Sequence, residues 1–170
     1  MADVRETKHV EANAEEVYDL VADLPRMGEW SPECEKVTWR GDATRAVKGA
    51  RFIGHNRVGA FRWFTFGEIV GADRGRDLAF EVTVGPAPVA RWEYFFIRDD
   101  EGDGCTVVEE WTDRRPAWYA TPTDRLLGSR ARRNTMGIQR TLDALKRGGR
   151  GATGPLSCVP SAFRAATAAS

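Results

Sequence analysis

The chain has 170 residues, of which 42% are hydrophobic and 29% charged, and its 25 basic residues balance its 25 acidic ones. This length suits one domain with a substantial core, and the zero net charge gives no overall field that would attract nucleic acid or an anionic membrane. No apolar run approaches a membrane span, and the N-terminus lacks a signal-peptide core. Three cysteines without CxxC spacing argue against a disulfide framework or a zinc site, so we expect a cytoplasmic protein without metal or cofactor.

The N-terminal residues predict a strand followed by a helix. Val4 to Glu11 has the length and composition of a short strand. Asn13 then precedes apolar residues at helical spacing, and Glu16 three positions later completes a capping box. Pro25 and Gly28 end this helix or begin a second short one.

Between residues 33 and 114 the chain consists of short segments rich in β-branched and aromatic residues, separated by turns that contain Gly or Asp. Together with the first strand, these segments make about seven predicted strands. Because the turns are short and parallel pairs need long crossovers, the pattern predicts an antiparallel meander. The predicted strands are Lys36–Arg40, Ala50–Arg57, Phe61–Val70, Leu78–Val84, Ala90–Arg98 and Cys105–Thr112.

A long helix is predicted after the strands. Thr121 and Pro122 form a typical helix start, and Gly148 with Gly149 forms a stop. One face carries apolar residues at intervals of three or four. We therefore expect one domain over residues 1–147 and a flexible tail over residues 148–170, which are rich in small residues. The residues of the helix face are Leu127, Ala131, Asn134, Ile138, Leu142 and Leu145.

A curved sheet of about seven strands cannot close tightly on itself when one helix must fill its concave face. Alternate strand residues and the helix face would then line the remaining space, and such pockets are mostly apolar with a few polar groups. The sequence therefore predicts an α+β domain with an internal cavity that binds a small hydrophobic molecule.

Two polar residues interrupt the apolar stripes of this predicted cavity. Asn56 and Asn134 either bind a polar group of the ligand or satisfy backbone groups of the sheet. The aromatic residues of the strands form either a wall for the ligand or ordinary core. The predicted ligand-binding residues are Asn56, Trp63, Phe80, Trp92, Tyr94, Trp111, Asn134 and Ile138.

Glu109 and Glu110 are neighbours on one strand, so only one of them faces inward. The sequence favours an ion pair between the inward carboxylate and Arg91 or another basic residue. A buried carboxyl group without such a partner would have a raised pKa and could act as a general acid or base. Neither histidine, His9 or His55, accompanies a nucleophile motif, and no catalytic residue is assigned.

Several segments of the chain carry a resemblance to known proteins, and these are Leu24–Pro32, Gly49–Arg57, Arg62–Val82, Ala90–Tyr94, Val108–Pro116 and Asn134–Lys146. Through these segments the sequence resembles the START-like, or SRPBCC, superfamily, and within it the polyketide cyclase/dehydrase and lipid transport group, especially a subgroup common in actinobacteria. The resemblance covers about residues 3–147 and implies a helix-grip fold, in which a curved antiparallel sheet surrounds a long C-terminal helix. It also implies hydrophobic-ligand binding. Aromatase/cyclase members use cavity Arg, Tyr and Asn or Ser groups, and no complete set of these maps onto this chain.

Three functional hypotheses follow. The first is a non-catalytic carrier or binding protein for a lipid-like or polyketide-like molecule, monomeric or homodimeric, without nucleic-acid binding or stable membrane insertion. The second is a polyketide cyclase, aromatase or dehydratase that acts in the same cavity. The third is a module that binds a protein partner. A titratable group facing the cavity would favour the enzyme, and a lining of apolar and amide groups would favour the carrier.

Overall fold

The computed structural model of the chain describes residues 2–29, 31, 33–116, 135–137, 139, 142 and 143. Its described part contains seven strands and two short helical segments between the first strand and the second. All seven predicted strands are present, with ends that shift by a few residues. The elements are β1 (Val4–Val10), α1 (Ala14–Ala22), the 3₁₀ helix η1 (Leu24–Glu29), β2 (Cys34–Arg40), β3 (Arg51–Val58), β4 (Phe61–Asp73), β5 (Asp77–Val84), β6 (Ala87–Arg98) and β7 (Cys105–Asp113).

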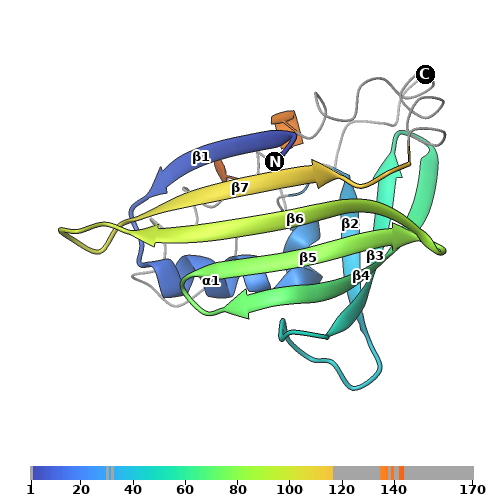
Figure 1. Cartoon of the computed structure of the whole chain (residues 1–170), viewed down its shortest axis with the longest axis horizontal. Coiled ribbons are helices and arrows are strands. Elements are labelled where there is room, and N and C mark those ends of the chain that lie inside the picture. The colour runs from blue at the N-terminus through green and yellow to red at the C-terminus, as the bar shows by residue number, and fades with distance from the viewer. Residues whose placement is uncertain are drawn as a thin grey trace, which may run out of the picture.

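The strands form one antiparallel sheet in the order β1-β7-β6-β5-β4-β3-β2, which confirms the predicted meander. Strands β1 and β2 follow each other in the chain but lie at opposite edges of the sheet. The segment α1–η1 connects these two edges, and α1 lies behind β5 and β6 in Figure 1. The helices therefore cover one face of a curved sheet.

Helix α1 begins as its sequence predicts. The side chain of Asn13 accepts a hydrogen bond from the backbone N–H of Glu16 at 2.9 Å, which satisfies one of the free donors of the first turn. The buried residues of α1 face the sheet, and the ring of Tyr18 meets the ring of Phe96 on β6 edge to face at 5.5 Å. We call the sheet face that α1 covers the inner face.

Irregular pairing bends the sheet. The register shifts between Ile69 and Gly71 in the β4–β5 pair and again between Val82 and Thr83 in the β5–β6 pair. Such bulges increase local twist and bend the strand that carries them. The second half of β4 stays paired with β5, whereas β2, β3 and the start of β4 run across the direction of β5, β6 and β7, as Figure 1 shows.

One close contact crosses the bent half of the sheet. Phe52 on β3 lies directly opposite Gly67 on β4, and a Cβ at Gly67 would come within 2.1–2.5 Å of the Phe52 ring. The ring therefore occupies the volume that any side chain at position 67 would need. It also meets the ring of Phe80 edge to face at 5.6 Å, which joins β3 to β5 across the inner face.

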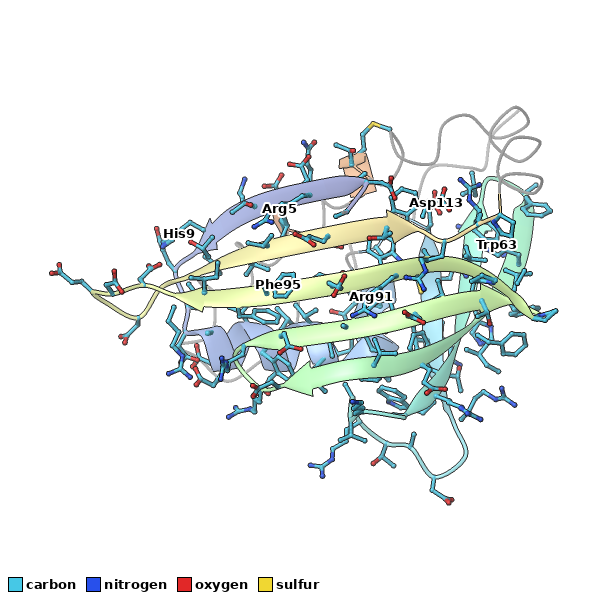
Figure 2. All side chains as sticks on the ribbon, in the orientation of Figure 1. Arg5, His9, Trp63, Arg91, Phe95 and Asp113 are labelled. Atoms are coloured by element: carbon cyan, nitrogen blue, oxygen red, sulfur yellow. The ribbon has the colours of Figure 1, made fainter. Side chains whose placement is uncertain are left out.

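Residues directly opposite each other in antiparallel strands share a face, so the register assigns the inner side chains. Tyr94 and Phe96 on β6 are buried on the inner face. Arg5, Arg91 and Phe95 belong to the alternate set and lie on the opposite face, toward the viewer in Figure 2. The sheet thus has a mainly apolar inner face with a few polar residues, and an outer face that carries charges.

The described residues between 135 and 143 are helical and lie within the predicted C-terminal helix. Leu142 is buried in the hydrophobic core, and Asp143 forms an ion pair with Lys8 of β1 at 2.7 Å. This helical segment therefore contacts the β1 side of the domain. The rest of the predicted helix, including Asn134 and Ile138, and the predicted tail lie outside the described residues, so the length of the helix stays a prediction.

Candidate ligand-binding site

The most deeply buried polar contact of the inner face joins β6 to β7. Tyr94 and Glu109 are directly opposite each other, and the Tyr94 hydroxyl donates a hydrogen bond to Oε1 of Glu109 at 2.7 Å. Their side chains are only 4% and 1% exposed. The other carboxylate oxygen, Oε2, has no hydrogen-bond partner among the described residues.

Burial decides the charge state of this pair. Desolvation raises the pKa of Glu109 from 4.5 to about 8, and the hydrogen bond from Tyr94 opposes this only partly. Burial and the nearby carboxyl group also raise the pKa of Tyr94 well above its usual 10. At neutral pH the Glu109 side chain is therefore mostly a neutral carboxylic acid, which can both donate and accept hydrogen bonds.

The sequence favours an ion pair for the inward glutamate, and no basic residue that the structure describes forms one with Glu109. Arg91 lies on the outer face, where it binds Glu81 at 3.1 Å and Glu93 at 2.9 Å. Glu110 also points outward and pairs with Arg5 at 2.8 Å. The reason is geometric, because alternation along β6 and β7 places the arginine and the inward carboxyl group on opposite sides of the sheet.

Aromatic side chains surround this pair on the inner face. Trp111 follows Glu109 by two residues, is 1% exposed, and lies opposite Trp92. The Nε1 atom of Trp111 is the other buried side-chain polar atom without a partner in the described part of the chain. The Phe80 ring stacks on the rings of Trp92 and Tyr94, with centroids 6.5 and 6.4 Å apart. The structure describes six of the predicted site residues. Five of these are aromatic and buried or half-buried, and they lie on β5, β6 and β7 with one, Trp63, on β4.

The remaining described prediction, Asn56, lies in the bent half of the inner face. Its amide nitrogen donates to the Gly54 carbonyl and to the Thr65 hydroxyl, both at 3.2 Å. A Cβ at Gly54 would lie 2.6 Å from that hydroxyl, so the glycine leaves room for this contact. The amide group thus satisfies sheet groups, which is one of its two predicted roles. Trp63, directly opposite Asn56, is half-buried and stacks on Phe61 at 5.5 Å.

Cys34 on β2 also lies opposite Asn56, and its side chain is buried. Burial raises the pKa of its thiol to about 11, so the nucleophilic thiolate is scarce at neutral pH. Within the described residues no three His, Cys, Asp or Glu side chains gather into a group that could hold a metal ion. No helix in that part of the chain is long and apolar enough to cross a membrane.

The arrangement combines an apolar aromatic surface with a neutral buried acid. Residues 1–148 match the family described as polyketide cyclase/dehydrase and lipid transport. The chain belongs to this family. A comparison of this polyketide cyclase/dehydrase family member with curated proteins finds no match.

Solved structures similar to this family member share its fold. A polyketide-cyclase-like protein from Corynebacterium glutamicum is 28% identical, with a TM-score of 0.57, and the match covers 90% of this chain and 94% of that one. A START superfamily protein from Mycobacterium smegmatis is 12% identical, with a TM-score of 0.62 and coverage of 88% and 97%. Norcoclaurine synthase from Thalictrum flavum, solved as a point mutant with a transition-state analogue, is also 12% identical, with a TM-score of 0.62 and coverage of 89% and 95%.

The predicted site and the observed arrangement differ most at Glu109, which the predicted ligand-binding set omits. The sequence does contain a signal for Glu109. This residue shares a strand face with Trp111, and alternation along the strand places its neighbour Glu110 on the other face. Of the predicted set, Asn56, Trp63, Phe80, Trp92, Tyr94 and Trp111 all belong to the inner face, and their contact with a ligand stays a prediction.

Proposed function

We propose that this protein binds a small, mainly apolar molecule against the inner face of the sheet and acts as a carrier or binding protein. The observation that carries the proposal is the aromatic surface formed by Phe80, Trp92 and Trp111 on neighbouring strands. Burial of apolar ligand surface there would contribute about 25 cal/mol per Å² before the cost of immobilising the ligand. Membership of a family described by lipid transport supports the same reading.

Photolabelling tests where the ligand binds. The probe is an uncharged twelve-carbon alkyl chain with a diazirine at its middle, irradiated with the full chain and mapped by peptide mass spectrometry. We expect adducts on inner-face positions such as Phe80 and Trp92. Phe64 and Ile97, which are 58% and 54% exposed on the outer face, serve as the internal control for non-specific surface labelling. Labelling confined to those two residues, or no saturable labelling, would contradict the proposal.

A second candidate function is a cyclase, aromatase or dehydratase. It is favoured by one observation, the titratable Glu109 carboxyl group on the inner face with a pKa near neutrality. As a neutral acid it could protonate a ligand carbonyl and then take a proton back as a base. The similar di-domain aromatase/cyclase from the BE-7585A pathway is 19% identical and shows the fold alone.

A model reaction separates the two candidates. The triketone 2,4,6-heptanetrione closes to 2,6-dimethyl-4-pyrone with loss of one water, a change that ultraviolet absorption follows. An enzyme would accelerate this closure, and Glu109→Gln would remove the acceleration while keeping photolabelling at Phe80. A carrier would bind the alkyl probe and leave the rate of closure unchanged.

A further inference from the structure

Two buried polar atoms of β7 lack partners within the described part of the chain, and they belong to neighbouring inner positions. These are Oε2 of Glu109 and Nε1 of Trp111. Both residues are 1% exposed, and they are two residues apart on one strand, so their side chains leave the sheet on the same side. Buried polar groups are normally hydrogen-bonded, so two adjacent exceptions require an explanation.

Both atoms are hydrogen-bond donors in the folded protein. An indole nitrogen donates and never accepts. The Tyr94 hydroxyl already donates to Oε1 of Glu109, so this oxygen acts as the acceptor of the carboxyl group. A carboxylic acid buried in this way keeps its proton, which then resides on Oε2. The inner face therefore presents two donors, about 7 Å apart along the backbone at the usual rise of a strand.

We propose that Glu109 and Trp111 recognise a neutral carbonyl oxygen of the ligand, as in a ketone, ester or quinone. This inference rests on the proposed binding of an apolar molecule at the same face and adds the polar group that such a molecule carries. A carbonyl oxygen offers acceptors only, and it matches two donors without bringing a charge into a buried site. An ammonium group would meet no acceptor at Trp111, and a carboxylate would bring a charge whose burial is costly.

Two ligands that differ in one atom test the proposal. They are 2-acetylnaphthalene and 2-isopropenylnaphthalene, in which a methylene group replaces the ketone oxygen, and binding to the full chain is measured by isothermal titration calorimetry. The wild-type protein should bind the ketone roughly five- to tenfold more tightly, because a ligand that leaves buried donors unpaired forfeits about one hydrogen bond. Trp111→Phe keeps the ring but removes the N–H, and it should reduce this ratio to roughly two or less.

Two further variants separate recognition from general damage. Tyr94→Phe with Glu109→Met removes both members of the buried pair together, which avoids leaving a lone polar group, and it should also abolish the ketone preference. Trp39→Phe on β2 is the matched control for the tryptophan exchange and should keep the wild-type ratio. Circular dichroism and thermal unfolding verify that each variant folds.

The outcomes are distinguishable. If both ligands bind the wild-type protein equally well, the carbonyl proposal is overturned and apolar binding stands. If neither ligand binds, the proposed function fails and this inference fails with it. A ketone preference that survives in Trp111→Phe and in the double variant would also overturn the assignment, because the donors would then lie elsewhere.

Discussion

Exchange of Glu109 for glutamine should change how stability depends on pH. The unfolded glutamate loses its proton near pH 4.5, whereas the folded one keeps it until about pH 8. Between these values the native state binds more protons than the unfolded state, so wild-type stability falls as pH rises through this window and levels off above it. A glutamine has no such proton, although its side-chain oxygen can still accept the hydrogen bond from Tyr94.

The size of this effect on the free energy of unfolding follows from the pKa shift of Glu109. Each pKa unit corresponds to about 1.4 kcal/mol. Relative to wild type, Glu109→Gln should gain about 1 kcal/mol in the free energy of unfolding at pH 5 and about 4 kcal/mol at pH 8. The two proteins should therefore diverge by about 3 kcal/mol across this range, apart from a constant offset due to the new amide group.

Urea denaturation at pH 5, 6, 7 and 8, followed by tryptophan fluorescence, measures this divergence. The titratable groups that face Glu109 from the neighbouring strands are Glu6 on β1 and Tyr94 on β6, and both remain in the variant. Glu110→Gln is the matched control, because its carboxylate is on the outer face and paired with Arg5. It should retain the wild-type slope. Parallel stability curves for wild type and Glu109→Gln would refute the assignment of a neutral buried acid.

Three other predictions concern packing and reactivity. Phe80→Ala should lower the free energy of unfolding by about 3–5 kcal/mol, whereas Phe64→Ala, at a side chain that is 58% exposed, should change it by less than about 1 kcal/mol; similar losses in chemical denaturation would contradict the burial pattern. Gly67→Ala should cost about 1–3 kcal/mol through its clash with Phe52, and Phe52→Leu in the same chain should restore part of that loss in a double-mutant cycle; simple additivity would argue against the clash. Cys34 should resist iodoacetamide in the folded protein at pH 8, because its thiol is buried and its pKa is about 11; peptide mapping that found rapid labelling would show an accessible thiolate.

Local signals predicted much of the fold. The N-cap at Asn13 forms within one helical turn, so its residues suffice to predict it, and the hydrogen bond from the Glu16 backbone N–H to the Asn13 side chain confirms it. The start of β6 was harder, because Pro88 discourages a strand assignment and the sequence alone predicts a start at Ala90. In the structure the pairing shifts register between Val82 and Thr83, beside Pro88, and an irregular ladder tolerates a residue without an N–H.

The partners within the site depend on register, which local pattern does not specify. Glu109 and Tyr94 are 15 residues apart, and they meet only because β6 and β7 pair so that these two positions are opposite. A shift of one residue would have placed Glu109 on the outer face. Charge attraction made Arg91 a plausible partner in sequence, yet strand alternation separates the two side chains. Inward-facing residues were therefore predictable as a class, whereas their hydrogen bonds were not.

The Phe52 ring fills the space that a side chain at position 67 would occupy, so these two positions share one volume. Neither can grow unless the other shrinks, so a bulky residue at 67 should occur only with a small one at 52 in homologous chains. Such an exchange would move aromatic bulk from β3 to β4 and alter the contact with Phe80. Relatives with the same backbone could in this way reshape one end of their inner surface by a paired substitution, without any change in the strand pairing.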